Sequence, residues 1–111
     1  MYQRDRPSGD EFRAPAGYTV ESLVAEDASL PRDAVRLRWT PAPPGARYQV
    51  RVTTEDLRVL TTATDLTVPE LLVPSDVLAS VATGSRVLWQ VEVTLPEGAT
   101  VSSNTFVTRV Q

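Results

Sequence analysis

Apolar and polar residues alternate with a period of two along much of the chain from Tyr18 onward. The clearest stretch covers residues 35–40, where three large apolar side chains alternate with Arg36, Arg38 and Thr40. The same pattern recurs at 48–53 and, over the longest run, at 86–94. A period of two is typical of β-strands with one face buried and the other in water. The pattern therefore predicts three half-buried strands, which pair most simply in an antiparallel sheet.

Weaker signals complete the set of strands. The residues after Tyr18 begin as an extended segment, 59–64 is rich in β-branched residues and predicts an edge strand, and 105–110 predicts the last strand. A short extended piece at 66–68 is expected to end at Pro69, since proline cannot donate to a strand ladder. One helical turn is expected at 75–81, with Ser75 or Asp76 as its cap. About seven short strands separated by proline, glycine and aspartate turns predict an all-β fold: an immunoglobulin-like sandwich of two antiparallel sheets.

The inward-facing positions of these strands define an expected core. Two tryptophans on different sheets, each able to bury on the order of 200 Å² of ring surface, would form its centre. The expected core residues are Val35, Leu37, Trp39, Tyr48, Val50, Val52, Val87, Trp89, Val91 and Phe106.

The outward positions offer a candidate interaction face. Arginine is favoured in interfaces for its planar donors and long apolar stem. An alternating polar face is also what any soluble sandwich shows, so a merely solvated surface is the competing interpretation. Exposed strand edges give a partner a second route, through main-chain hydrogen bonds. The candidate face consists of Gln49, Arg51, Gln90, Glu92 and Arg109 on one sheet, with Arg36 and Arg38 outward on the other.

The first sixteen residues differ from the rest. They mix charges with Pro7, Gly9 and Pro15 and contain few apolar side chains, so residues 1–16 are predicted to be a flexible acidic leader or linker, and 17–111 the folded domain. Phe12 is the exception, an apolar ring able to dock on the domain edge. The whole net charge of -3 lies within residues 1–34, and the remainder is neutral. A neutral body has no basic field for phosphates, which argues against nucleic-acid binding.

Composition removes most catalytic chemistry. The chain has no cysteine and no histidine, hence no thiolate nucleophile, no imidazole base and no Cys/His metal cage. The adjacent carboxylate pairs Glu26–Asp27 and Glu55–Asp56 lie in turn-like sequence and are interpreted as solvated. No calcium loop or phosphate-binding glycine motif occurs. We therefore expect no enzymatic activity, no cofactor and no metal. No segment approaches the roughly 20 apolar residues needed to cross a bilayer, so this segment is not expected to insert in a membrane.

Specific residues also resemble a known family. RLRWTPAPPGARYQVRVTT, Thr67 to Pro69 and VLWQVEV are similar to the strands of fibronectin type III modules, over roughly residues 20–111, although Val87 stands where that family usually has a tyrosine. EFRAPAGYTV, ESLVAEDASLP and VRLRW resemble the fibronectin-like domains that follow a membrane segment in bacterial anti-sigma-factor-like envelope proteins. This resemblance implies an extracytoplasmic location, in the periplasm or at the cell surface, and leaves room for a membrane helix upstream.

Together these observations predict a non-catalytic protein-interaction or spacer module of a bacterial envelope protein, with the sensory outer domain of an anti-sigma-like regulator as its most specific form. The expected partner is a protein whose identity the sequence does not give. The alternative is a carbohydrate-associated accessory domain of a secreted enzyme. That alternative needs exposed aromatic side chains, whereas Trp39, Trp89 and Tyr48 are predicted to point inward.

Overall fold

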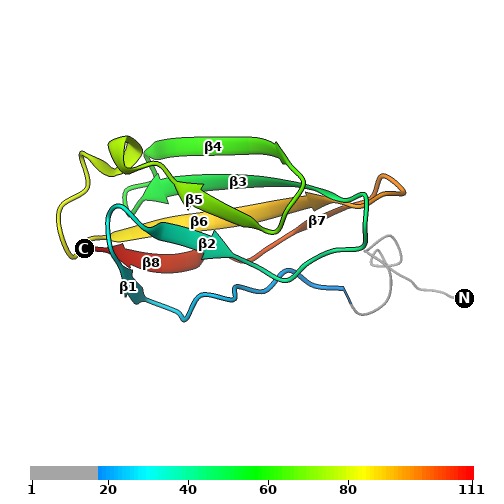
Figure 1. The fold of residues 1–111 in the computed structure, drawn as a ribbon, viewed down its shortest axis with the longest axis horizontal. Helices are drawn as coiled ribbons and strands as arrows, with labels where there is room; N and C mark the ends of the chain where they lie inside the picture. Colours follow the sequence, from blue (N-terminus) through cyan, green and yellow to red (C-terminus); the bar gives the residue numbers. More distant parts are fainter. Residues whose placement is uncertain (1–17) are drawn as a thin grey trace, which may run out of the picture.

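The computed structural model describes residues 18–111, so the predicted leader and Phe12 lie outside the described residues. Eight strands and one short 3-10 helix occur in the described part of the chain (Figure 1). The strands are β1 (Ala28–Leu30), β2 (Val35–Arg38), β3 (Arg47–Thr54), β4 (Val59–Leu66), β5 (Glu70–Val73), β6 (Arg86–Thr94), β7 (Thr100–Ser102) and β8 (Phe106–Val110), and the 3-10 helix is η2 (Ser75–Leu78).

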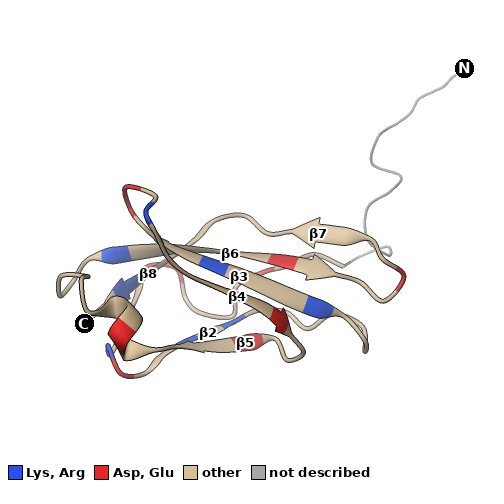
Figure 2. Cartoon of the chain, turned by 90° about the horizontal axis from the view of Figure 1, so that it is seen from above, with Lys and Arg blue, Asp and Glu red and all other residues tan. Residues whose placement is uncertain are grey.

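The strands form two sheets that face each other (Figures 1 and 2). The larger sheet has the order β1-β8-β6-β3-β4, and β7 also pairs with β6; the smaller sheet consists of β2 and β5. All pairings are antiparallel except that of β1 with β8, which is parallel. The predicted all-β sandwich is therefore confirmed, with one parallel pair that the period-two pattern did not indicate.

The segment before β1 crosses from one sheet to the other. Ser22 forms an isolated bridge with Trp39, and the Leu23 N–H donates to the carbonyl of Arg38 at 2.9 Å, which attaches this part to the small sheet. Four residues later the Asp27 N–H donates to the carbonyl of Val107 at 3.0 Å, and β1 continues along β8. Asp27 has a φ of 61°, a left-handed conformation that aspartate tolerates better than most residues.

The core lies between the sheets and centres on the two indoles. Trp39 directly follows β2 in the small sheet and Trp89 lies in β6 of the large one, with ring centroids 6.3 Å apart. Tyr48 meets Trp39 edge-on at 5.5 Å, and Phe106 packs on Trp89 at 4.7 Å. Nine of the ten expected core residues are buried, and Phe106 is half-buried. The alternation of apolar and polar residues thus indicated the inner face of β2, β3 and β6.

The prediction for residues 59–73 is wrong in its boundaries. The edge strand does not end at Thr64 but continues to Leu66, and the fifth strand is Glu70–Val73 instead of 66–68. Pro69 precedes β5 and does not interrupt a strand: it lacks an N–H, but its carbonyl accepts a hydrogen bond from the N–H of Trp39 at 3.2 Å. Proline at the start of a strand costs no ladder bond, so a strand can begin immediately after it.

Two smaller expectations also need correction. The helical turn is present but shorter than predicted, ending at Leu78, and no side chain caps it: Pro74 occupies the N-cap position in place of Ser75 or Asp76. The strand count is eight rather than about seven, because the three-residue β7 pairs with β6 after the turn at residues 95–99. Three residues are too few to show a period, so the sequence pattern gave no signal for β7.

Candidate interaction surface

A row of three apolar side chains and one threonine crosses the outer face of the large sheet. The strand register places Val59 of β4 beside Thr53 of β3, Thr53 beside Leu88 of β6, and Leu88 beside Val107 of β8. The side chains of Leu88 and Val107 point away from the core because the buried residues beside them, Val87, Trp89 and Thr108, point inward. We call Val59, Thr53, Leu88 and Val107 the apolar row. An outer face that only meets water would be polar at these positions.

Leu57 adds a more exposed leucine next to the row. It lies in the β3–β4 hairpin, where the Leu57 N–H donates to the carbonyl of Thr54 and the Thr54 N–H donates to that of Arg58, both at 2.9 Å. Its φ is 69°, a conformation that glycine or asparagine adopts more readily, and its side chain is 70% exposed. Leu57, Thr53, Val59 and Leu88 line part of a shallow hollow of 270 Å³ on this face.

An ion-pair network borders one side of the row. Arg86 and Arg109 lie directly opposite each other on β6 and β8, an arrangement that would be repulsive without a counterion. The carboxylate of Asp27 lies between them, 3.2 Å from Nε of Arg86 and 3.1 Å from Nε of Arg109, and Glu55 pairs with Arg86 at 3.3 Å. Arg109 also donates to the carbonyl of Gly84 at 2.9 Å.

The pKa of Asp27 reflects this network. Partial burial would raise the pKa of this carboxyl, but hydrogen bonds from Arg109 and Arg86, together with their charges, lower it below its ordinary value. The same contacts raise the pKa of Arg86. The pKa of Asp56 is lowered as well, first by a hydrogen bond from the hydroxyl of Thr54. A general acid needs a raised carboxyl pKa, so neither aspartate has the character of one.

The structure divides the predicted interaction face into two parts. Gln49 lies opposite Glu92, and Arg51 opposite Gln90, so these four residues form one polar group on the outer face of β3 and β6. Arg109 also points outward but lies beyond the apolar row, within the Asp27 network. Among the described residues no ion pair involves Glu92.

The apolar row was missed because it becomes visible only when four strands are placed in register. The alternation over residues 86–94 places Leu88 on the outward face, and a large apolar residue in that position is the one signal available from the sequence. The conformation of Leu57 leaves no mark in the sequence, since leucine is not a typical residue for a positive φ. Arg36 and Arg38 are exposed on the small sheet as expected, and Arg36 pairs with Glu70 at 3.2 Å.

Two features were looked for along residues 18–111: a cluster of metal-ligating side chains and a long apolar helix. No cluster of three or more acidic residues that could hold a metal ion occurs there. None of the helices in that range has the length and apolar character needed to span a bilayer.

Comparison with known proteins gives a likeness in fold. No protein-family model matches the chain, and no curated protein sequence shows significant similarity to it. The crystal structure of CopC from Methylosinus trichosporium OB3b superposes with a TM-score of 0.53 and 12% sequence identity, covering 84% of this chain and 92% of CopC. At this identity the likeness concerns the fold alone. The chain thus has an immunoglobulin-like β-sandwich fold similar to that of CopC.

Proposed function

We propose that this chain is a non-catalytic protein-interaction module of an extracytoplasmic bacterial protein, and that the outer face of its large sheet contacts the partner. The exposed, conformationally costly Leu57 beside the apolar row is the observation that carries the proposal. The left-handed conformation costs an L-residue roughly 1–2 kcal/mol, which glycine would avoid. Strained backbone and exposed apolar side chains are common at binding sites.

The borders of the row fit an interface for a protein. A typical interface has an apolar centre surrounded by polar and charged residues, with arginine enriched. Here the Arg86–Asp27–Arg109 network lies on one side, and the Arg51–Gln90 pair lies on the other. A module of this kind in the outer part of an anti-sigma-like regulator is the specific form that the sequence resemblances support.

No feature of the described residues favours the carbohydrate-binding alternative. Sugar-binding faces rely on exposed aromatic rings, but no aromatic side chain between Tyr18 and Gln111 is exposed. Trp39, Tyr48 and Trp89 are buried, while Tyr18 and Phe106 are half-buried. Tyr18 is further tied to the domain through its hydroxyl, which donates to the carbonyl of Thr40 at 3.2 Å.

A photo-cross-linking residue in place of Leu88 tests the proposal in the cells that naturally produce the protein. We expect one discrete protein adduct, which disappears when Val59→Asp is added because a charge then lies in the contact. Leu72, exposed on the outer face of the small sheet, provides the matched control position. An adduct at twice the mass of the chain would identify the partner as a second copy. Equal adducts from both positions, or none from position 88, would show that the row is ordinary surface and that the domain acts as a spacer.

A further inference from the structure

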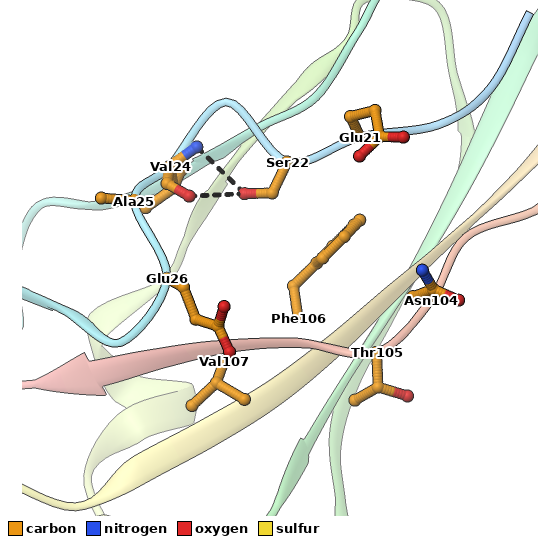
Figure 3. Close-up of a pocket in the computed structure, with 9 residues that line it drawn as sticks. All are labelled: Glu21, Ser22, Val24, Ala25, Glu26, Asn104, Thr105, Phe106 and Val107. Atoms are coloured by element: carbon orange, nitrogen blue, oxygen red, sulfur yellow. Dashed lines mark hydrogen bonds between the residues drawn. The ribbon is translucent and has the colours of Figure 1, made fainter.

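A groove of 430 Å³ lies where the chain crosses between the sheets (Figure 3). One wall is the segment from Glu21 to Glu26, and the other is the chain from Asn104 to Val107. Ser22 fixes the first wall, because its hydroxyl donates to the carbonyl of Val24 at 2.8 Å and accepts from the Val24 N–H at 3.0 Å. The ring of Phe106 stands between the walls, as Figure 3 shows.

The β8 side of this groove consists of the first residues of β8 and the chain directly before them. Hydrogen bonding between this stretch and the preceding chain begins at the bond from Asp27 to Val107. Before that point, no backbone hydrogen bond within the described chain joins residues 104–106 to residues 21–26. At about 3.3 Å per residue, the open stretch is about 10 Å long. Unpaired strand edges are templates for another strand.

Charge and apolar character limit what can occupy the groove. Glu21 and Glu26 flank it, and neither forms an ion pair with a described residue. Phosphates and other anions would be repelled by the two carboxylates. Phe106, packed on Trp89 at 4.7 Å, offers a firm apolar surface to one side chain of an occupant.

We propose that this groove binds an extended basic segment of a partner protein, which adds to the edge of β8 as a further strand. Its backbone pairs with the open stretch at residues 104–106, an apolar side chain packs on Phe106, and flanking lysine or arginine side chains meet Glu21 and Glu26. The site is distinct from the apolar row and does not depend on it, so each can fail without the other.

Titration of the full 111-residue protein with a capped peptide of alternating arginine and valine, followed by amide NMR, tests this inference. We expect shift changes at residues 22–26 and 104–107. Glu21→Gln combined with Glu26→Gln is expected to weaken binding about tenfold, as for the loss of two exposed ion pairs of good geometry. The control pair Asp33→Asn and Glu97→Gln changes the net charge equally, on exposed residues outside the groove, and is expected to retain most of the affinity.

Three further results would overturn the inference. If a peptide with glutamate in place of arginine binds as tightly as the arginine–valine peptide, charge does not select the occupant. If a peptide methylated on alternate backbone nitrogens binds as tightly, the occupant does not add as a strand. The chain's own Phe12 and Arg13 also combine an aromatic ring with a cation. If Phe12→Ala with Arg13→Ala shifts the groove resonances without peptide, the groove is filled by the protein itself. The Leu88 cross-linking experiment is independent of all three outcomes.

Discussion

At the scale of single residues, Leu57 has a backbone conformation that its side chain does not favour. Leu57→Gly is expected to raise the free energy of unfolding by about 1 kcal/mol, because relief of the left-handed conformation exceeds the extra entropy that glycine loses on folding. Urea denaturation measures this change. Leu57→Asn should lie between the two, since asparagine tolerates a positive φ. A glycine variant less stable than the natural protein would mean that Leu57 supports the fold and is not kept for contact.

The two buried indoles differ in their hydrogen bonding. Trp89 Nε1 donates to the hydroxyl of Thr108 at 3.0 Å, whereas Trp39 Nε1 is buried without a partner in the described chain. Trp89→Phe should therefore destabilise more than Trp39→Phe, by about 1 kcal/mol, because only the first breaks a hydrogen bond and leaves a buried hydroxyl unpaired.

Thermal unfolding of the two variants provides this comparison. Thr108→Val serves as the control: added to Trp89→Phe it should cost little, since both partners of the bond are then apolar. Equal losses of stability in the two phenylalanine variants would show that the hydrogen bond between Trp89 and Thr108 makes no net contribution to folding stability.

At the scale of elements, the Asp27 network joins the turn before β1 to β6 and β8, and we expect its contribution to stability to depend on pH. Because the pKa of Asp27 is lower in the folded protein than in the unfolded chain, the ionised carboxylate stabilises the fold at neutral pH. That stabilisation is lost as the pH falls through the folded pKa, from about pH 5 downward. Asp27→Asn should lower the melting temperature at pH 7, flatten the acid dependence, and have less effect in high salt because Arg86 and Arg109 are then screened.

The control for this prediction is Asp33→Asn, on an exposed carboxylate that forms no ion pair with a described residue. It should leave the melting curve and its pH dependence nearly unchanged. If Asp27→Asn has no larger effect than this control, Arg86 and Arg109 tolerate each other without the carboxylate.

The sequence predicted those elements whose signal is local. Long strands such as 86–94 show their period directly, and the inward set around Trp39 and Trp89 follows from it. Strand ends depend on partners elsewhere in the chain, as Pro69 shows. Its carbonyl accepts a hydrogen bond from the N–H of Trp39, which directly follows β2, so Pro69 precedes a strand instead of ending one. The parallel pairing of β1 with β8 brings residues 28–30 beside residues 108–110, and no local pattern encodes it.

The candidate surface follows the same rule. Gln49, Arg51, Gln90 and Glu92 could be grouped from the sequence because the alternation fixes which side chains point outward on each strand. Their distance from Arg109, and the apolar row between, depend on register across β4, β3, β6 and β8. Register is set by bulges and turns, including shifts between Tyr48 and Val50 and between Val52 and Thr53, which alternation alone does not reveal.

At the scale of the whole molecule, the large sheet has two faces with different physical roles, and both carry apolar residues. The inner face stabilises the domain through full burial, as for Val91, whereas Val59 on the outer face is 54% exposed. Val59→Lys is therefore expected to change the free energy of unfolding by no more than about 0.5 kcal/mol. Val91→Lys should prevent folding, because an unpaired buried charge costs most or all of the roughly 5–15 kcal/mol by which a domain is stable. Circular dichroism separates the two outcomes. If the outer face is a contact surface, Val59→Lys must also abolish the cross-link from position 88 while the fold is retained. If the Val59→Lys variant is unfolded, the Val59 side chain belongs to the core and the apolar row supports the fold instead of a partner.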